Sequence, residues 1–196
     1  MIIGVDIDDT LTDIRKELQK ASFDYAKGLN KQINESSMSF DKNNDGSSFK
    51  EKYNFTHEEL QYFFKNIQEK IIKSAEPRED VVECIKKIRE DGNQIYIITA
   101  RDYEFHDDPY GISKEWLGKN GIEYDKLVVN ARSKAKVCLE EKVDIFIDDK
   151  LSNCIDVSNA GILTIRITNY EDEHQNIVNK KNWKDIYEYI KEITID

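Results

Sequence analysis

The amino-acid sequence predicts an α/β fold in which five parallel strands form one sheet, helices cover both faces, and a helical segment is inserted after the first strand. Two observations lead to this prediction. From Pro77 onward, short apolar runs alternate with helical patterns, which is typical of a parallel sheet with crossover helices. Residues 14–76, by contrast, show no convincing strand and repeat apolar residues at helical spacing. The 196 residues are enough for one domain with such an insertion.

Each predicted strand is a short apolar run, and the segments between the strands place apolar residues at helical spacing. The strands are expected at 2–7, 94–99, 127–129, 143–147 and 162–167. The helices are expected from 77 to 91, through 114–117 to near 121, at 133–141, at about 151–159 and at 183–193. Pro77 and the acidic residues after it favour a helix start, and glycines at 92, 121 and 161 favour helix ends.

Two helices are predicted within the insertion, each with one apolar face. The second follows Thr56 and Glu59, which have the spacing of a capping box. The polar stretch 31–48 between the helices is rich in Asn and Ser and is expected to be a loop. Apolar residues of the second helix, including Phe63 and Phe64, are expected to form the core of the insertion. The apolar faces consist of Ile14, Leu18, Ala21, Tyr25 and Leu29, and of Leu60, Phe63, Phe64, Ile67 and Ile71.

The formal net charge of −10 argues against a nucleic-acid polymer or an anionic membrane surface as the main partner, because both require a basic face. It leaves room for a small phosphorylated substrate, which needs only a local positive site or a metal ion. No apolar run approaches the length of a membrane span, and the N-terminus does not resemble a signal peptide. We therefore expect a cytoplasmic protein; the oligomeric state is left open.

Cys84, Cys138 and Cys154 are the three cysteines of the chain. Their number is odd, their spacing is wide, and none belongs to a CxxC pair or a zinc-ligand pattern. We interpret them as small buried side chains in a reducing compartment.

Polar residues follow three of the predicted strands. The first strand ends in the sequence DIDDT from Asp6 to Thr10, the second in Thr99-Ala100-Arg101, and the fourth in Asp148-Asp149. Lys134 and Lys136 begin the helix before the fourth strand. Because ligands bind beyond the carboxyl ends of strands in an open parallel sheet, we expect these groups to meet in one crevice.

This set of groups suits phosphoryl transfer. Asp6 and Asp148 offer the oxygen ligands that Mg²⁺ prefers, and a carboxylate screened by the ion can attack phosphorus. Asp8, two residues after Asp6, lies on the same side of an extended chain and can act as general acid and base. Thr99 can donate a hydrogen bond to a phosphoryl oxygen, and a lysine can neutralise charge on the transferred group.

The motif DxDxT after a first strand, a Thr after the second, a Lys, and a strand that ends in DD resemble the four-motif pattern of the haloacid dehalogenase superfamily of phosphatases. The resemblance implies a Rossmann-like catalytic core at 1–13 and 77–196 and a helical cap at 14–76. It also implies roles for individual residues. These are Asp6 as nucleophile, Asp8 as general acid/base, Thr99 and Lys134 as phosphate ligands, and Asp6, the carbonyl of Asp8 and Asp148 as Mg²⁺ ligands assisted by Asp149.

Within this superfamily, the sequence ITAR, the run SKAKVCLEEKVDIFIDD and the all-helical insertion are most similar to the 5′-nucleotidases and deoxyribonucleotidases. In that group the motif lysine precedes a cysteine by four residues, which favours Lys134 over Lys136. The implied substrate is a (deoxy)nucleoside monophosphate. A sugar phosphate or another small phosphorylated metabolite is the alternative for the same chemistry.

A phospho-accepting or phosphate-binding module without turnover is the alternative of another class. Receiver domains of this kind also use Asp, Thr and Lys at strand ends, but their phosphorylated Asp ends the third strand. Here the third predicted strand ends in Val129-Asn130, without such an Asp.

Several other residues have two interpretations. Arg101 either binds substrate phosphate or forms a structural ion pair. Tyr53 and Phe55 precede the second helix of the insertion in a loop and are candidates for contact with a nucleobase. The stretch His106–Asp108 resembles a metal cluster, but we interpret it as a solvated loop.

Residues Asp41–Gly46 match the first half of a calcium-binding EF-hand loop. The twelfth position of that loop requires a bidentate Glu, and here it is Lys52. We therefore interpret this stretch as a polar turn.

Overall fold

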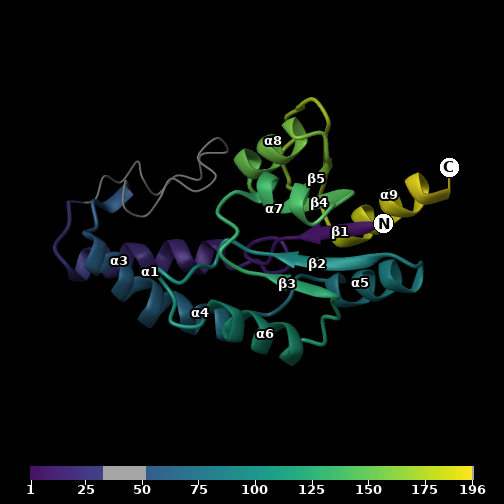
Figure 1. The fold of residues 1–196 in the computed structure, drawn as a ribbon. Coiled ribbons are helices and arrows are strands. Elements are labelled where there is room, and N and C mark those ends of the chain that lie inside the picture. Colours follow the sequence, from purple (N-terminus) through teal and green to yellow (C-terminus); the bar gives the residue numbers. More distant parts are fainter. Residues whose placement is uncertain (33–51, 196) are drawn as a thin grey trace.

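A computed structural model of the chain describes residues 1–32 and 52–195 (Figure 1). The calcium-loop-like stretch Asp41–Gly46 lies outside the described residues, as does most of the polar loop expected at 31–48. Among the described helices, none is both long enough and apolar enough to cross a membrane.

One six-stranded sheet forms the centre of the molecule, with strand order β3-β2-β1-β4-β5-β6. All pairs of neighbouring strands in this sheet are parallel. This confirms the predicted class of fold, although the predicted number of strands was five. The strands are β1 Ile2–Val5, β2 Gln94–Ile98, β3 Lys126–Val128, β4 Ile145–Asp148, β5 Leu163–Ile167 and β6 Ile177–Lys180.

The additional strand, β6, pairs with β5 at the edge of the sheet, with Thr164 opposite Ile177. Its four residues are all only partly buried, and only the first two are apolar. A short edge strand of this kind carries a weak sequence signal, because one side of it needs no partner and little of it is in the core.

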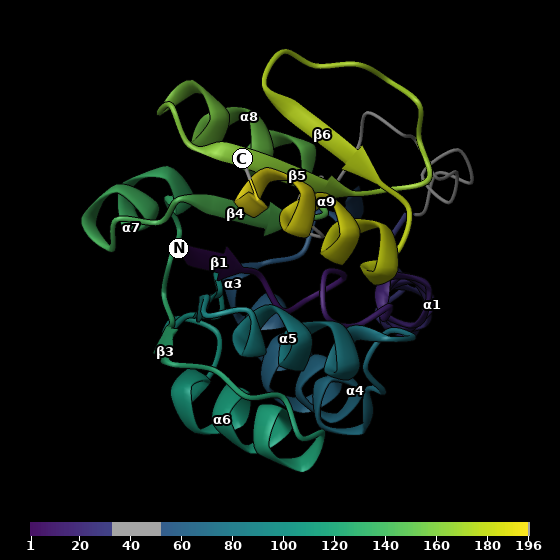
Figure 2. The same cartoon turned by 90° about the vertical axis from the view of Figure 1, so that its right-hand side faces the viewer.

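Helices cover both faces of the sheet, as the alternating pattern predicts (Figure 2). Apolar residues of α5 Val81–Glu90, α6 Pro109–Lys119 and α9 Trp183–Ile195 pack with one set of strand residues in the larger core cluster. Residues of α7 Lys134–Glu140 and α8 Leu151–Asn159 belong to a second cluster around Phe146. The strands are sandwiched between these layers, which leaves the strand ends as the place for polar side chains.

The predicted helix through 114–117 begins earlier than expected, at Pro109. Asp108 precedes it, and its carboxylate accepts a hydrogen bond of 2.8 Å from the amide of Gly111. Asp at the N-cap followed by Pro at the first helical position is a standard helix start, so the sequence did contain this boundary.

The insertion is helical throughout its described elements. These are α1 Arg15–Gly28, α3 His57–Phe63, the π-helical turn η2 Phe64–Gln68 and α4 Glu69–Ser74, and we call them the cap helices. The predicted capping box is present, since Thr56 and Glu59 exchange both of its hydrogen bonds. The second predicted helix is therefore real, but its middle turn is widened, and the amide of Glu69 bonds the carbonyl of Phe64.

The cap helices α1 and α3 lie beyond the carboxyl ends of the strands (Figure 1). Helices α1 and α4 pack against the sheet domain through an apolar cluster that includes Ile112 of α6. A second cluster lies within the cap, and Phe63 is fully buried while Phe64 packs against its edge. The cap core predicted from Phe63 and Phe64 is thus present.

Candidate active site

The turn after β1 carries the first group of acidic residues. The amide of Asp6 still bonds the carbonyl of Ile147, at 3.0 Å, so Asp6 continues the strand. The chain then closes tightly, because the carbonyl of Ile7 accepts the amides of Thr10, Leu11 and Thr12 at 2.9–3.3 Å. This turn directs Asp6 and Asp8 to the carboxyl end of the sheet, where the sequence predicted them.

Residues outside the turn hold it in place. The guanidinium of Arg78 donates to the carbonyl of Asp9 at 2.8 and 3.2 Å, and the indole of Trp183 donates to the carbonyl of Thr10 at 3.1 Å. Trp183 is itself 1% exposed. Because the backbone of the turn is fixed from two sides, its carboxylates have little freedom to relax away from one another.

Lys134 is the lysine that reaches the acidic turn. Its ammonium lies 2.5 Å from a carboxylate oxygen of Asp6, and it also donates to the carbonyl of Ile98. The side chain of Lys134 is 2% exposed, whereas that of Lys136 is 73% exposed and lies 3.8 Å from Glu140. Lys134 and Lys136 leave α7 in different directions, and only the first enters the site.

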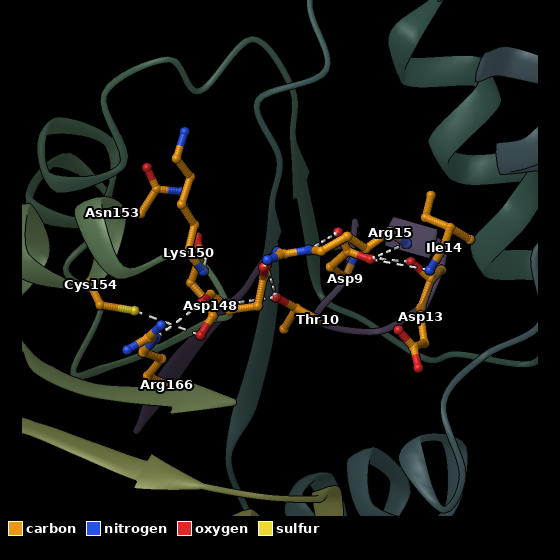
Figure 3. A network of polar contacts seen from close by, with 12 residues as sticks. Asp9, Thr10, Asp13, Ile14, Arg15, Asp148, Lys150, Asn153, Cys154 and Arg166 are labelled. Carbon is orange, nitrogen blue, oxygen red and sulfur yellow. Dashed lines mark hydrogen bonds and ion pairs between the residues drawn. The ribbon is translucent and has the colours of Figure 1, made fainter. Parts of the chain in front are cut away.

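Asp148 is the last residue of β4 and points to the same site as Thr10 (Figure 3), and Asp149 follows it. Asp148 is fully buried and accepts hydrogen bonds from the amide of Lys150 at 2.8 Å and from the side chain of Asn153 at 3.0 Å. Asp149 accepts a hydrogen bond of 3.2 Å from the hydroxyl of Thr10 and pairs with Arg15. The DD motif is therefore tied to the turn after β1.

Asp6, Asp148 and Asp149 form one cluster, in which a carboxylate oxygen of each lies within 4.8 Å of the others. Burial raises the pKa of Asp6, although the Lys134 ammonium opposes this. Burial and the charge of Asp6 raise the pKa of Asp148 to about 7, and burial and the charge of Asp148 raise that of Asp149 well above its ordinary range. The pKa values of Asp148 and Asp149 stay raised although Lys134 and Arg15 lie beside the acids, so the cluster fits a divalent cation with oxygen ligands.

Asp8 points to Arg101 rather than into this cluster. The guanidinium makes two hydrogen bonds with the carboxylate, of 2.7 and 2.9 Å. Burial alone would raise the pKa of Asp8, but the Arg101 guanidinium outweighs it and holds the pKa below its ordinary value. Arg101 therefore forms the ion pair that was one of its two interpretations, and its partner, Asp8, is a residue of the site.

Thr99 lies between these groups, directly after β2. It is 1% exposed, its amide bonds the carbonyl of Val128 at 2.9 Å, and its hydroxyl oxygen accepts from the amide of Arg101 at 3.3 Å. The structure thus brings together Asp6, Asp8, Thr99, Arg101, Lys134, Asp148 and Asp149, which were all expected at one edge of the sheet.

Two arginines in the site were not expected from the sequence. Arg15 begins α1, and its guanidinium pairs with Asp9 at 3.0 Å and with Asp149. Arg166 in β5, labelled in Figure 3, is 2% exposed. It donates to the carbonyl of Asp149 at 3.2 Å and also pairs with Asp172. The sequence contained one signal for Arg166. It is a charged residue within the apolar run LTIRI, and a charge in a buried strand needs a polar partner.

Tyr53 and Phe55, the candidates for contact with a nucleobase, are 1% and 2% exposed. Their ring centroids lie 5.3 Å apart, and that of Phe55 also lies 5.3 Å from Tyr25 of α1. Both rings pack in the apolar cluster of the cap. Their contact with a substrate remains a prediction that this packing does not support.

The stretch His106–Asp108, which was interpreted as a solvated loop, contains residues that differ in their exposure to solvent. Asp107 is exposed, at 84% of its side chain, as predicted. Asp108 is also exposed and is the N-cap of α6, whereas His106 is only 3% exposed, so the interpretation was wrong for His106. Within the described residues, the one acidic or histidine cluster arranged for a metal is that of Asp6, Asp148 and Asp149.

The fold, the family to which the chain belongs and its relatives together identify a phosphoric monoester hydrolase of the haloacid dehalogenase superfamily. A hydrolase of the haloacid dehalogenase-like family from Streptococcus pneumoniae has a similar fold, with a TM-score of 0.66 at 15% identity over 96% of this chain and 97% of that chain.

The chain belongs to the family described as 5′ nucleotidase, deoxy (pyrimidine), cytosolic type C protein, whose pattern matches residues 1–194. It is similar to a Bacillus cereus protein named "Putative nucleotidase", with 28% identity over 97% of this chain and 98% of the relative. A nucleotidase from Clostridium acetobutylicum is also 28% identical, over 66% of this chain and 67% of the relative.

Proposed function

We propose that this hydrolase cleaves nucleoside monophosphates through a phosphorylated Asp6, with Mg²⁺ as its cofactor. The observation that carries the proposal is the cluster of Asp6 with Asp148, Asp149 and the buried ammonium of Lys134, beside the second aspartate, Asp8. Each group of a two-step phosphoryl transfer is present within this cluster and its immediate neighbours. The preference for nucleotides is supported by the family of the chain and by the nucleotidases that it resembles.

In the first step, a carboxylate oxygen of Asp6 attacks phosphorus, and the bond between phosphorus and the leaving oxygen breaks. Asp8 gives its proton to that oxygen, so the alcohol leaves neutral. In the second step, Asp8 takes a proton from water, the resulting hydroxide attacks phosphorus, and the bond to Asp6 breaks. Inorganic phosphate leaves, Asp6 is again a carboxylate, and Asp8 again carries the proton that it gave in the first step.

The positive groups balance the charge of the phosphoryl oxygens. Lys134 neutralises the carboxylate of Asp6 so that a phosphate dianion can approach it, and Thr99 offers a hydroxyl donor. Mg²⁺, held by Asp6, the carbonyl of Asp8, Asp148 and Asp149, supplies charge screening of the acids and of the phosphoryl group.

Asp8 cannot donate a proton while it is paired as a carboxylate with Arg101. Substrate binding must therefore separate this pair. Asp8 then takes up a proton from water before the first step, and the donors of Arg101 become available to phosphoryl oxygens. In this way Arg101 has both of the roles considered for it, the ion pair before binding and phosphate binding afterwards.

We also propose that 14–76 acts as a cap over a catalytic core formed by 1–13 and 77–196. Arg15 of α1 reaches Asp9 and Asp149, so the cap contacts both acidic motifs. A cap in this place excludes water and bulky phosphoproteins from the site, which suits a small substrate.

The test is phosphate release from a panel of nucleoside monophosphates and sugar phosphates, with Mg²⁺ and with EDTA. We expect Mg²⁺-dependent turnover that Asp6→Asn reduces at least about 1000-fold, because the nucleophile is lost. Asp13→Asn is the matched control, since Asp13 lies in the same segment but is 64% exposed. Turnover by Asp6→Asn near the wild-type rate would contradict the mechanism, and a sugar phosphate as best substrate would contradict the nucleotide preference.

A further inference from the structure

We infer that His106 is a specificity-determining residue whose Nδ1 atom binds a hydrogen-bonding group of the leaving alcohol, in a nucleotide a group of the nucleoside. The inference rests on the proposed function, because it takes Asp8 to be the group that protonates the leaving oxygen. It concerns a loop, from Asp102 to Asp108, that supplies none of the motif residues.

The first observation is a buried polar atom without a partner. His106 is 3% exposed, and within the described residues its Nδ1 atom accepts and donates no hydrogen bond. Burial and the nearby Arg101 charge lower the pKa of His106, so the ring is neutral and each nitrogen is either a donor or an acceptor. A buried polar atom left unpaired costs free energy, and a ligand that pairs with it recovers that cost.

The second observation is the place of the ring. The charges of Arg101, Asp8, Glu69 and Asp102 act on the ring, so it lies within electrostatic reach of the Asp8–Arg101 pair, and its centroid is 6.0 Å from that of the Phe64 ring in the cap. In phosphoryl transfer the attacking and leaving oxygens are roughly in line, on opposite sides of phosphorus. Asp8 marks the leaving side, because it protonates the leaving oxygen. A group next to Asp8 and toward the cap therefore faces the alcohol part of the substrate.

The third observation is that the ring is held in position before any ligand binds. The amide of His106 bonds the carbonyl of Asp102 at 3.1 Å. The carboxylate of Asp102 accepts the amides of Glu104 and Phe105 at 3.0 and 3.1 Å, and it pairs with Arg132. A side chain on a loop fixed in this way can discriminate between ligands, because little order has to be gained on binding.

The cap packs against the loop that carries His106. The ring of Phe64 in η2 stacks on Phe105 at 4.7 Å and meets the His106 ring edge-on at 6.0 Å. Gln68, in the same π-helical turn, also has a buried oxygen, Oε1, without a partner among the described residues. The cap and the loop thus each hold a buried polar atom that has no partner among the described residues, and π-helical turns are frequent at functional sites.

The experiment compares kcat/KM for two esters. One is phenyl phosphate, whose leaving group has no further hydrogen-bonding group, and the other is the best wild-type substrate among nucleotides and sugar phosphates. We expect His106→Phe to lower kcat/KM about tenfold for the polar ester and less than about twofold for phenyl phosphate. His106→Asn, whose amide reaches the position of Nδ1, should restore most of the loss. His106→Gln, whose amide reaches the position of Nε2, should not.

His57→Phe is the matched control, because His57 also contacts Phe105 but its side chain is 53% exposed. Its kcat/KM should stay at the wild-type value for both esters, and melting temperatures verify that all variants fold. An equal loss on both esters in His106→Phe would show an action through Asp8 or the cap and overturn the inference, as would no loss at all. A wild type that cleaves neither ester would overturn the proposed function as well. The wild-type rates therefore distinguish a failure of the proposed function from a failure of the inference on His106 alone.

Discussion

Lys134 and Asp6 are 128 positions apart in the sequence and 2.5 Å apart in the structure. Their pairing follows from two local facts. Asp6 ends the central strand, and Lys134 is the first residue of α7, directly after its N-cap Ser133. A lysine two positions later, Lys136, lies on the outer side of the same helix. At the scale of the residue, a shift of two positions separates a buried ligand of the site from a solvated charge.

We predict that Lys134→Met lowers kcat/KM for phosphate release about 100-fold or more, because a buried positive donor next to the nucleophile is lost. Lys136→Met removes the same charge from a side chain that is 73% exposed, and its activity should stay within about twofold of the wild type. The measurement is phosphate release at saturating Mg²⁺. Similar losses in the two variants would contradict the assignment of Lys134.

At the scale of the element, most helices and strands begin and end within a few residues of the predicted positions. The exceptions have physical reasons. Helix α6 begins at Pro109, before the apolar spacing that predicted it, because an N-cap and a first-turn proline define a helix start without apolar residues. The strand β6 was not predicted, because an edge strand with two apolar residues resembles a loop. In the loop before α6, only His106 contradicts the interpretation as solvated, because its exposure depends on the cap packed against it.

We predict that Asp108→Ala lowers the free energy of unfolding by about 1 kcal/mol, because the amide at the start of α6 loses its cap. Asp107→Ala is the neighbouring control. Its carboxylate is 84% exposed and pairs only with Lys65 among the described residues, so the change should be less than about 0.5 kcal/mol. Urea unfolding of the two variants measures both values. An equal loss would show that the cap of α6 is not what Asp108 contributes.

At the scale of the whole molecule, the acidic site is a meeting point of separate elements. Asp6 comes from the end of β1, Asp148 and Asp149 from the end of β4, and Arg15 from the first cap helix. The three acids keep raised pKa values although Lys134 and Arg15 pair with them, so the cluster is unfavourable for the folded chain unless a further cation compensates it. Folding and cation binding should therefore be coupled.

We predict that Mg²⁺ raises the melting temperature of the protein. At about 100 times the dissociation constant, binding to the folded chain alone adds about 2.7 kcal/mol, which corresponds to roughly 5 °C or more for a chain of this size. Asp148→Asn should abolish most of this shift, whereas the exposed Asp13→Asn should keep it. Calorimetry with Mg²⁺ and with EDTA measures the shift. The same shift in Asp148→Asn would place the ion elsewhere.

The sequence by itself determined the class of fold and the residues that meet at the strand ends. It could do so because burial on both faces forces strands into continuous apolar runs, and because carboxyl ends of parallel strands share one edge. Only the tertiary structure decided which way several other side chains face: Asp8 toward Arg101, Tyr53 and Phe55 into the core of the cap, and His106 into the interior. These choices depend on neighbours that are distant in the sequence, and residue type and local spacing carry no information about such neighbours.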